Sequence, residues 1–311
     1  MTEIRKRFRA LVAAEDTLVM PGAYDALSAK IIESVGFQAA VAGGYAALGS
    51  MLAEADMGQS NMRDMADHYA RVCNAVNIPV LVDADTGFGG VNNVRNMVKA
   101  FEAAGAAAFI ISDQVFPNRC AYIPGKQVVP IEEMLSKLKA ALDARRDESF
   151  VIVARTDAAS VLGADAAIER ACMFAELGAD MIKPQQLDTR EEIRRILREV
   201  PKPFSATLSQ AAGRHPLDLD DFRELGVPAV SLPSTALFAA VAGVRKVMEG
   251  VKRTGSMRAV QEDVVKLEEY YDLVGLPAMT RREESYAAAA QAVIEKMGAR
   301  KPPAKQAQGQ R

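Results

Sequence analysis

Short apolar runs rich in Val, Ile and Ala alternate with amphipathic stretches along most of the chain. Runs of this kind, separated by segments long enough for a helix, are typical of parallel strands joined by crossover helices. We place eight strands at residues 18–22, 39–44, 79–85, 107–112, 150–156, 180–185, 203–208 and 229–234. Four of the intervening segments end in a glycine soon after an acidic residue, as a left-handed helix C-cap does: Gly36, Gly105, Gly178 and Gly226.

Eight strand–helix units in 311 residues predict a (β/α)8 barrel of the TIM type. We expect one domain over residues 1–298, including two additional helices at 258–275 and 280–298. Residues 299–311, a polar segment with Pro, Gln and Lys, are predicted to be a disordered tail. A doubly wound open sheet is the alternative fold, but no GxGxxG motif follows the first strand.

The charge and hydropathy of the chain limit the classes of molecule that it could bind. The formal net charge is only −2, which provides no basic surface for nucleic acid or anionic lipid. No signal peptide is visible, and no apolar run approaches the roughly 18 residues that a membrane span needs. We therefore expect a cytoplasmic protein without nucleic-acid or membrane partners. The three cysteines lack CxxC spacing, which argues against a disulfide framework or a zinc site.

Several of the predicted strands end in polar residues. The carboxyl ends of the strands are where barrel enzymes carry their catalytic groups. Asp83 and Asp85 alternate in strand period, so both should face the barrel mouth. Two converging carboxylates favour a hard cation such as Mg²⁺ or Mn²⁺, although an Asx turn would also account for them. Arg155 and Asp157 close the fifth strand in the same way. Arg155 is the expected clamp for a substrate carboxylate or phosphate, with a structural ion pair as the alternative.

Lys183 lies two residues before Gln185 in the sixth predicted strand and should share its inward direction. A lysine inside a barrel is costly to bury as a cation. One interpretation is an ion pair with a strand-end aspartate such as Asp157. The other is a role in the site, either as a cation that stabilises an enolate or as an amine that forms a Schiff base with a 2-oxo acid.

Six ordered motifs then carry a family resemblance: "PGAYDALSAK" (21–30), "ADMG" (55–58), "VDADTGFGG" (82–90), "DQVFPNRC" (113–120), "GK" (125–126) and "ARTDA" (154–158). Over residues 5–250 the chain resembles the isocitrate lyase and phosphoenolpyruvate mutase superfamily. Its nearest groups are short lyases of the methylisocitrate and dimethylmalate type. The resemblance implies a Mg²⁺-dependent cleavage of a carbon–carbon bond in a substituted malate or isocitrate. It also implies a homotetramer whose last barrel helix is exchanged between subunits.

Carried over by position, the resemblance makes Asp85 the direct metal ligand, with Asp83 and Asp56 holding metal-bound waters and substrate. The thiol of Cys120, on a loop that closes over the substrate, would protonate the carbanion left by bond cleavage. We expect the neighbouring Arg119 to be able to lower the pKa of this thiol. The substrate-holding loop after the second strand carries Gly43, Gly44 and Tyr45.

Departures from the lyase pattern fall in the substrate pocket. Ala121 and Tyr122 replace a glycine and a histidine after the catalytic cysteine, and Ser112 and Gln185 replace two glutamates near the metal. Thr207 stands at an expected asparagine, Gln210 stands near an expected glutamate, and Gly44 and Tyr45 stand where Thr or Ser is usual. The pocket is therefore rebuilt, and magnesium should bind more weakly than in the lyases.

Three functional hypotheses follow. The first is a Mg²⁺-dependent lyase that acts on a 2-hydroxy or 2-oxo dicarboxylic acid through a pyruvate-type enolate. The second is decarboxylation or hydrolysis of an oxaloacetate-like acid, or cleavage of a phosphonate P–C bond, through the same enolate. The third is a degenerate family member that binds a small acid without catalysis. Specificity lies in the rebuilt loops, so the sequence does not name the substrate.

Overall fold

The computed structural model describes residues 1–209, 213 and 215–298 and contains all eight predicted strands. They are β1 (Leu18–Pro21), β2 (Ala40–Ala42), β3 (Val80–Asp83), β4 (Ala108–Ser112), β5 (Val151–Thr156), β6 (Met181–Pro184), β7 (Ser205–Thr207) and β8 (Ala229–Leu232). Each lies within the apolar run that predicted it. Gln210 and the predicted tail at 299–311 lie outside the described residues.

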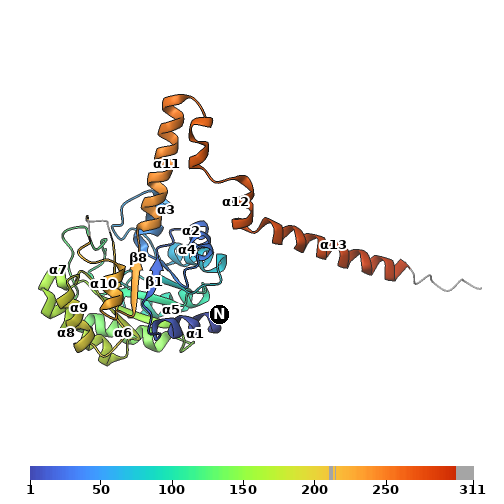
Figure 1. The fold of residues 1–311 in the computed structure, drawn as a ribbon. Helices are drawn as coiled ribbons and strands as arrows, with labels where there is room; N and C mark the ends of the chain where they lie inside the picture. The colour runs from blue at the N-terminus through green and yellow to red at the C-terminus, as the bar shows by residue number, and fades with distance from the viewer. Residues whose placement is uncertain (210–212, 214, 299–311) are drawn as a thin grey trace, which may run out of the picture. The chain divides into compact units, whose positions relative to one another are not determined.

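Every strand pair is parallel, and the strands form a closed ring. One sheet has the order β2-β3-β4-β5-β6 and the other the order β1-β8-β7. Single parallel bridges join them, Gly22 to Val41 between β1 and β2, and Ile182 to Phe204 between β6 and β7. The prediction of a (β/α)8 barrel is therefore confirmed, with helices outside the ring of strands (Figure 1).

Helices connect successive strands and cover the outside of the ring. The barrel portion contains α1 (Thr2–Val12), α2 (Ala26–Ser34), α3 (Gly44–Leu52), α4 (Met62–Ala75), α5 (Val91–Ala103), α6 (Ile131–Ala144), α7 (Ala159–Leu162), α8 (Ala164–Leu177), α9 (Arg190–Glu199), α10 (Leu219–Glu224) and α11 (Thr235–Thr254). All four predicted cap glycines have positive φ, between 71° at Gly226 and 112° at Gly178. A side chain would strain the backbone there, which explains the choice of glycine.

Two apolar clusters lie on the two faces of the strands. One fills the barrel interior, where Leu81, Ile110, Val153 and Met181 pack with Phe8 of α1. The other lies between the strands and the surrounding helices and contains the alternate strand residues, such as Val82, Ile111 and Ile152. This alternation determines which side chains reach the barrel mouth. The next inward-facing residues after Leu81, Ile110, Val153 and Met181 lie two positions further on, at the carboxyl ends of the strands, and are Asp83, Ser112, Arg155 and Lys183.

The chain divides into two compact units, and the second begins at Met257. The second unit contains a 3-10 helix, η1 (Arg258–Asp263), and two α-helices, α12 (Leu267–Val274) and α13 (Leu276–Gly298). The prediction of one continuous helix at 258–275 is wrong, because Val264 and Lys266 have extended backbone conformations. Two consecutive β-branched residues, Val264 and Val265, lower the helix propensity at this point. The assignment of residues 1–298 to a single domain stays a prediction.

No helix within the described part of the chain is both long enough and apolar enough to cross a membrane.

Candidate active site

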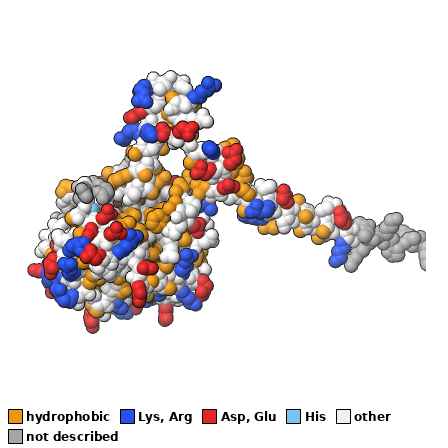
Figure 2. Space-filling view, viewed as in Figure 1, with side chains coloured by type: hydrophobic (Ala, Val, Ile, Leu, Met, Phe, Trp, Pro, Cys, Tyr) orange, Lys and Arg blue, Asp and Glu red, His pale blue; other side chains and the backbone are white. Residues whose placement is uncertain are grey.

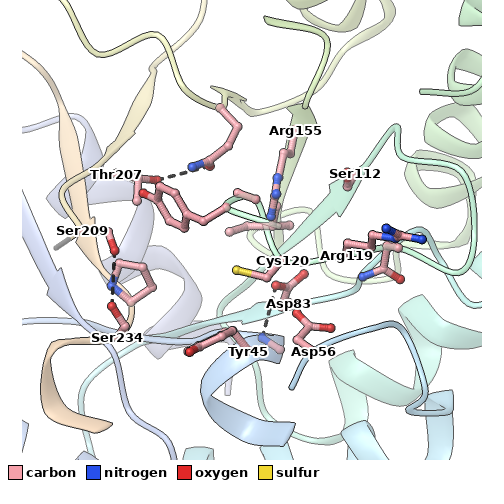
Figure 3. A pocket seen from close by; sticks show the side chains of 18 of the residues that line it. Tyr45, Asp56, Asp83, Ser112, Arg119, Cys120, Arg155, Thr207, Ser209 and Ser234 are labelled. Carbon is pink, nitrogen blue, oxygen red and sulfur yellow. Dashed lines mark hydrogen bonds between the residues drawn. The ribbon is translucent and has the colours of Figure 1, made fainter. Parts of the chain in front are cut away.

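A cavity at the carboxyl ends of the strands is lined by most of the site residues predicted from the sequence (Figure 3). These residues come from seven different segments and are Gly43, Gly44, Tyr45, Asp56, Asp83, Asp85, Cys120, Arg155, Lys183, Gln185 and Thr207. Figure 3 shows Cys120 near the centre, between Arg155 on β5 and the two carboxylates of Asp56 and Asp83. Ser209 and Ser234 lie at the side of the cavity opposite Arg119.

Asp83 and Asp85 converge as predicted, but not because both belong to a regular strand. Strand β3 ends at Asp83, and Asp85 follows with a left-handed φ of 47°. The backbone N–H of Asp85 donates to Asp83 Oδ1 at 3.0 Å, so the chain turns around the first carboxylate. The predicted Asx turn and the predicted pair of carboxylates are therefore the same feature.

The carboxylate of Asp85 is buried beside two other acidic groups. It accepts hydrogen bonds from Asn118 Nδ2 at 2.9 Å and from Ser60 Oγ at 3.4 Å. Burial and the charges of Asp83 and Asp56 raise its pKa well above the ordinary value. Burial and the charge of Asp83 likewise raise the pKa of Asp56 to about 6. The charge of Asp83 thus disfavours ionisation of both Asp85 and Asp56, and a divalent cation beside these carboxylates would offset that repulsion.

The surroundings of these carboxylates fit magnesium rather than a metal that needs a cage of protein ligands. Among the described residues, no group of three or more His, Cys, Asp or Glu side chains is arranged to hold a metal ion. Mg²⁺ keeps several waters and binds through one or two carboxylates, so Asp85 with Asp83 is sufficient. The buried Asn118 Oδ1, which has no hydrogen-bond partner within the described chain, is a further oxygen beside Asp85.

Helix α3 begins at the cavity, and its close approach to two carboxylates accounts for the glycine at position 44. The N–H of Gly44 donates to Asp83 Oδ2 at 3.2 Å, which places the positive end of the helix against that carboxylate. A Cβ at this position would lie 3.2 Å from Asp85 Oδ1 and 3.5 Å from Asp83 Oδ2. Glycine therefore allows the helix to approach both acids closely.

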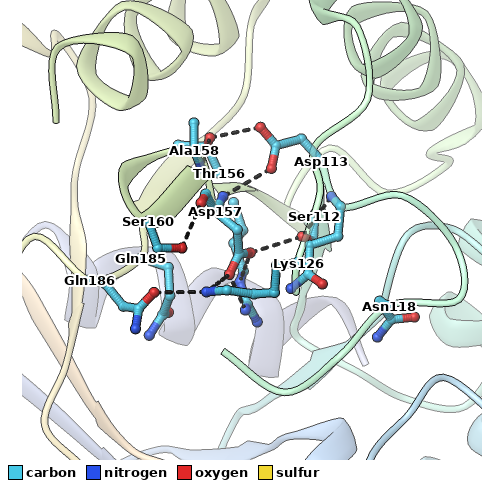
Figure 4. A network of polar contacts seen from close by, with 12 residues as sticks. Ser112, Asp113, Asn118, Lys126, Thr156, Asp157, Ala158, Ser160, Gln185 and Gln186 are labelled. Atoms are coloured by element: carbon cyan, nitrogen blue, oxygen red, sulfur yellow. Dashed lines mark hydrogen bonds and ion pairs between the residues drawn. The ribbon is translucent and has the colours of Figure 1, made fainter. Parts of the chain in front are cut away.

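Arg155 is held by a buried ion pair with Asp157. Its Nε and Nη2 donate to the two oxygens of Asp157 at 2.7 and 2.9 Å. Asp157 also accepts from Lys126 Nζ at 3.3 Å and from Ser112 Oγ at 3.1 Å (Figure 4). Burial opposes ionisation of Asp157, but the charges of Arg155 and Lys126 and the hydrogen bonds from Arg155 and Gln114 hold its pKa below the usual value.

The placement of Asp157 at the barrel mouth is corrected by this network. Asp157 is fully buried behind Arg155 and is absent from the cavity lining, although it follows the strand end directly. Ser112 lies in the lining, but its hydroxyl donates to Asp157 rather than to the acidic side of the cavity. The structural ion pair of Arg155 is present and orients a guanidinium that lines the cavity, and its role as a clamp for a substrate anion stays a prediction.

The segment 113–129 carries Cys120 and is fastened across the cavity at several points. Asn118 bonds to Asp85, Lys126 bonds to Asp157, and the N–H of Cys120 donates to the carbonyl of Asp56 at 3.4 Å. Gly58 accommodates this segment, since a Cβ there would lie 2.8 Å from the backbone nitrogen of Asn118. These contacts hold the segment across the cavity.

Burial raises the pKa of the Cys120 thiol, and the charge of Asp56 adds to this effect. The expectation that Arg119 lowers this pKa is wrong. The Arg119 guanidinium donates to the carbonyl of Pro124, whereas Arg155 and Lys126 are the cations that oppose the rise. The thiol is consequently protonated near neutral pH, as a proton donor must be.

Lys183 lies in the wall formed by β6, β7 and β8. Its Nζ donates to the carbonyl of Ala206 at 3.2 Å and to Ser231 Oγ at 3.1 Å. The predicted ion pair with Asp157 is wrong, and no carboxylate in the described part of the chain forms an ion pair with this amine. Burial, and next the positive charge of Arg155, lower the pKa of Lys183 to about 7.

Several residues that line the cavity or bond to its acidic groups and to Asp157 were not assigned a role from the sequence. Asn118 and Lys126 lie within two of the motifs, "DQVFPNRC" and "GK", so the resemblance carried a signal for them. Ser60, Ser231 and Ser234 carried none, because isolated serines between elements have many structural roles. Tyr122 also lines the cavity, next to Cys120.

A parallel barrel with clustered carboxylates, a guanidinium and a thiol at its mouth is typical of a class of enzymes that act on small acids. The phosphoenolpyruvate phosphomutase family profile matches residues 8–252. The chain therefore belongs to the phosphoenolpyruvate phosphomutase family, and the predicted superfamily is confirmed.

Curated relatives include lyases. The chain is 37% identical over 275 residues to 2-methylisocitrate lyase from Aeropyrum pernix, which covers 88% of each protein. It is 34% identical over 282 residues to 2,3-dimethylmalate lyase from Eubacterium barkeri, which covers 90% of this chain and 97% of the relative. The prediction of a family of carbon–carbon lyases is thus confirmed.

Solved structures with the same fold include hydrolases. Oxaloacetate acetylhydrolase in complex with 3,3-difluorooxalacetate superposes with a TM-score of 0.86 at 25% identity, covering 92% of this chain and 98% of that one. Phosphonopyruvate hydrolase in complex with oxalate and Mg²⁺ superposes with a TM-score of 0.81 at 31% identity, covering 91% and 99%.

The buried amine of Lys183 generates a prediction about stability and pH. Because its pKa is near 7 in the folded chain and about 10.5 in the unfolded chain, the unfolded state binds one more proton between these values. The free energy of unfolding of the wild type should therefore rise with pH in this window, relative to Lys183→Met. The expected slope is roughly 1.4 kcal/mol per pH unit. The charged groups that act on Lys183 are Arg155, Asp83, Asp157 and Asp188.

Urea unfolding of the wild type and of Lys183→Met, at intervals from pH 7.5 to about 9.5, measures this difference. Lys139→Met is the matched control, since Lys139 is an exposed lysine paired with Asp143 on α6. The control should differ from the wild type by an amount that does not change with pH. A difference between the wild type and Lys183→Met that is equally constant would show that Lys183 is charged in the folded protein.

Proposed function

We propose that this chain is a Mg²⁺-dependent carbon–carbon lyase that cleaves a 2-hydroxy or 2-oxo dicarboxylic acid through a pyruvate-type enolate. The observation that carries the proposal is the gathering of Asp83, Asp85, Arg155 and Cys120 around one cavity. Such a cavity combines a cation site, an anion clamp and a proton donor. Relatives named as lyases of methylisocitrate and dimethylmalate support the same chemistry.

The acidic side of the cavity would hold the metal. Asp85 is the proposed ligand, while Asp83 and Asp56 would orient metal-bound waters and the substrate hydroxyl. When bound, Mg²⁺ supplies electrostatic stabilisation of the enolate oxygen. A relative whose structure contains oxalate and Mg²⁺ supports this assignment. Mn²⁺, which also prefers oxygen ligands, should substitute for Mg²⁺.

The opposite side of the cavity would bind the rest of the acid. Asp157 engages Nε and Nη2 of Arg155, which leaves Nη1 for a substrate carboxylate. Gln185 and Thr207 are joined at 3.4 Å and can hydrogen-bond the second carboxylate or a hydroxyl. Gly43, Gly44 and Tyr45 at the start of α3 would border the pyruvate-like part, close to the carboxylates.

Cys120 would complete the reaction. Cleavage of the carbon–carbon bond leaves an electron pair on the departing acid, and the thiol of Cys120 would protonate that carbon. Burial keeps the thiol protonated until this step. Closure of the segment 113–129 would exclude bulk water, which otherwise competes as proton donor.

A second candidate is hydrolysis or decarboxylation of an oxaloacetate-like acid, or cleavage of a phosphonate P–C bond. The likeness to oxaloacetate acetylhydrolase and phosphonopyruvate hydrolase favours it. Release of pyruvate, glyoxylate, CO₂ and phosphate from a panel of malates, isocitrates, oxaloacetates and phosphonates distinguishes the candidates. A thermal shift with these acids but no turnover of any would indicate a non-catalytic binder.

We also propose that the active form is a homotetramer in which C-terminal helices are exchanged between subunits. Helix α13 carries a row of exposed apolar side chains, Tyr286, Val293, Ile294 and Met297, at intervals that place them along one face (Figure 2). Exposed apolar residues on this scale favour burial against a partner. A second copy of the chain is the partner that the family resemblance favours.

The metal assignment predicts the behaviour of Asp85→Ala and Asp85→Asn. Both should lose turnover by roughly 10³-fold or more, since several kcal/mol of enolate stabilisation would be lost. The Mg²⁺-dependent thermal shift should also disappear. Without metal, Asp85→Asn should be at least as stable as the wild type, because one of three mutually repelling acids is removed.

Steady-state assays and thermal shift with and without Mg²⁺ provide these measurements. The exposed Asp67→Ala on α4 serves as control and should behave as the wild type. Retention of both turnover and the Mg²⁺ shift in Asp85→Asn would show that the metal binds elsewhere.

Cys120→Ser should fold normally and lose about 10²-fold or more of lyase turnover, because a hydroxyl is a much weaker acid than a thiol. Cys172→Ser, on α8, is the matched control and should retain full activity. Comparison of kcat for the two variants on the best substrate gives the answer. Undiminished turnover in Cys120→Ser would favour the hydrolase or decarboxylase candidate over the lyase.

The tetramer proposal predicts that Tyr286→Glu combined with Ile294→Glu lowers the mass of the particle in solution. Charges on this face would have to be buried in the assembly, at a cost that the apolar side chains do not incur. Size-exclusion chromatography with light scattering should give four chains for the wild type and fewer for the double variant. Glu284→Lys, on another side of α13, should leave the mass unchanged; a wild-type monomer would refute the proposal.

A further inference from the structure

Lys183 has two hydrogen-bond acceptors and no carboxylate partner. Its Nζ lies 3.2 Å from the carbonyl oxygen of Ala206 and 3.1 Å from Ser231 Oγ. The Ser231 hydroxyl itself donates to the Ala206 carbonyl at 3.2 Å, so its oxygen is available as an acceptor for the amine. A neutral amine has two protons to donate, and these two acceptors satisfy both.

An ammonium group would fit this position poorly. It would carry a third proton with no acceptor among the described residues, and its charge would lie in the barrel wall without a paired carboxylate. The acids of the network pair elsewhere, since Asp157 is bound by Arg155 and Lys126. The pKa of about 7, lowered by burial and next by Arg155, agrees with this geometry.

The amine nevertheless belongs to the cavity. Lys183 lines the same space as Arg155, Cys120 and Asp83. A neutral lysine amine that lines a binding cavity is a nucleophile, whereas a protonated surface lysine is not. The compounds that the proposed function admits to this cavity include 2-oxo acids, whose carbonyl carbon is the electrophile that an amine attacks.

We propose that Lys183 forms an imine with the carbonyl carbon of a 2-oxo acid bound in the cavity. The lone pair of Nζ attacks the carbonyl carbon, and the C–O bond breaks. Both amine protons leave with the oxygen as water, and a C=N bond replaces the C=O bond. No electrons are gained or lost by the pair of reactants. The imine nitrogen can then take up a proton and withdraw electrons from the neighbouring carbon.

This imine would give the cavity a second way to stabilise an enolate-like carbon, independent of the metal. The inference rests on the proposed function only in assuming that a 2-oxo acid enters the cavity. Arg155 would hold the carboxylate of that acid, and the resulting orientation would present its carbonyl to the β6 side of the cavity.

Reductive trapping tests the proposal. The full-length protein, treated with chelator or loaded with Mg²⁺, is incubated separately with pyruvate, glyoxylate and oxaloacetate and then reduced with borohydride. Intact mass should show one adduct per chain that corresponds to the reduced imine, also in the presence of chelator. Proteolysis and peptide mass analysis should locate it at Lys183 in the wild type, independently of how any variant folds.

Lys183→Arg and Lys183→Met should form no adduct, and the exposed-lysine control Lys139→Met should form it as the wild type does. Circular dichroism establishes that the variants are folded. No adduct with any of the three acids, or adducts spread over other lysines and unchanged in Lys183→Arg, would overturn the proposal. Mg²⁺-dependent lyase turnover is measured on the same samples. Turnover without an adduct refutes the imine and leaves the lyase proposal intact, whereas an adduct without turnover refutes the lyase proposal alone.

Discussion

The buried pair of Arg155 and Asp157 is the interaction on which the arrangement of the site depends. Breaking a buried ion pair from one side costs roughly 3–5 kcal/mol, because the remaining charge is left without a partner. Asp157 accepts hydrogen bonds from Arg155 of β5, from Ser112 of β4 and from Lys126 of the segment that carries Cys120. One fully buried carboxylate thereby fixes the guanidinium of Arg155 and one end of the segment 113–129.

A second buried acid, Asp113, holds the backbone N–H of Asp157 and the side chain of Thr156 before it. Asp113 accepts from Thr156 Oγ1 at 2.7 Å and from the N–H of Asp157 at 2.9 Å, and it pairs with Arg170 of α8 at 3.0 Å. Arg170 also donates to the carbonyl of Val129, where the loop ends. The chain of contacts therefore runs from a helix outside the barrel to the guanidinium inside the mouth. Networks that satisfy every charge hold catalytic groups in one orientation.

The sequence predicted the fold almost completely because a barrel of parallel strands leaves two regular signals. Apolar runs mark the strands, and glycines such as Gly178 mark the helix ends. Most of the residues that line the cavity could also be predicted, because the strand ends of a parallel barrel meet at one mouth. The hydrogen-bond and ion-pair partners of these residues could not. Whether Asp157 pairs with Lys183 or with Lys126 depends on side-chain directions at the ends of short strands, where the two-residue alternation stops.

Charge is distributed unevenly across the cavity, and this explains how the departures from the lyase pattern fit together. Asp56, Asp83 and Asp85 form one side, whereas serine, threonine and amide groups with a single amine form the side of β6 to β8. A glutamate at position 185, two residues beyond Lys183 in β6, would have offered a charge of opposite sign, and an ion pair would have raised the pKa of Lys183. Ser112 and Gln185 provide no such charge. The replacements that would weaken the water shell of a bound metal thus also leave Lys183 without a carboxylate partner, and burial then lowers its pKa to about 7.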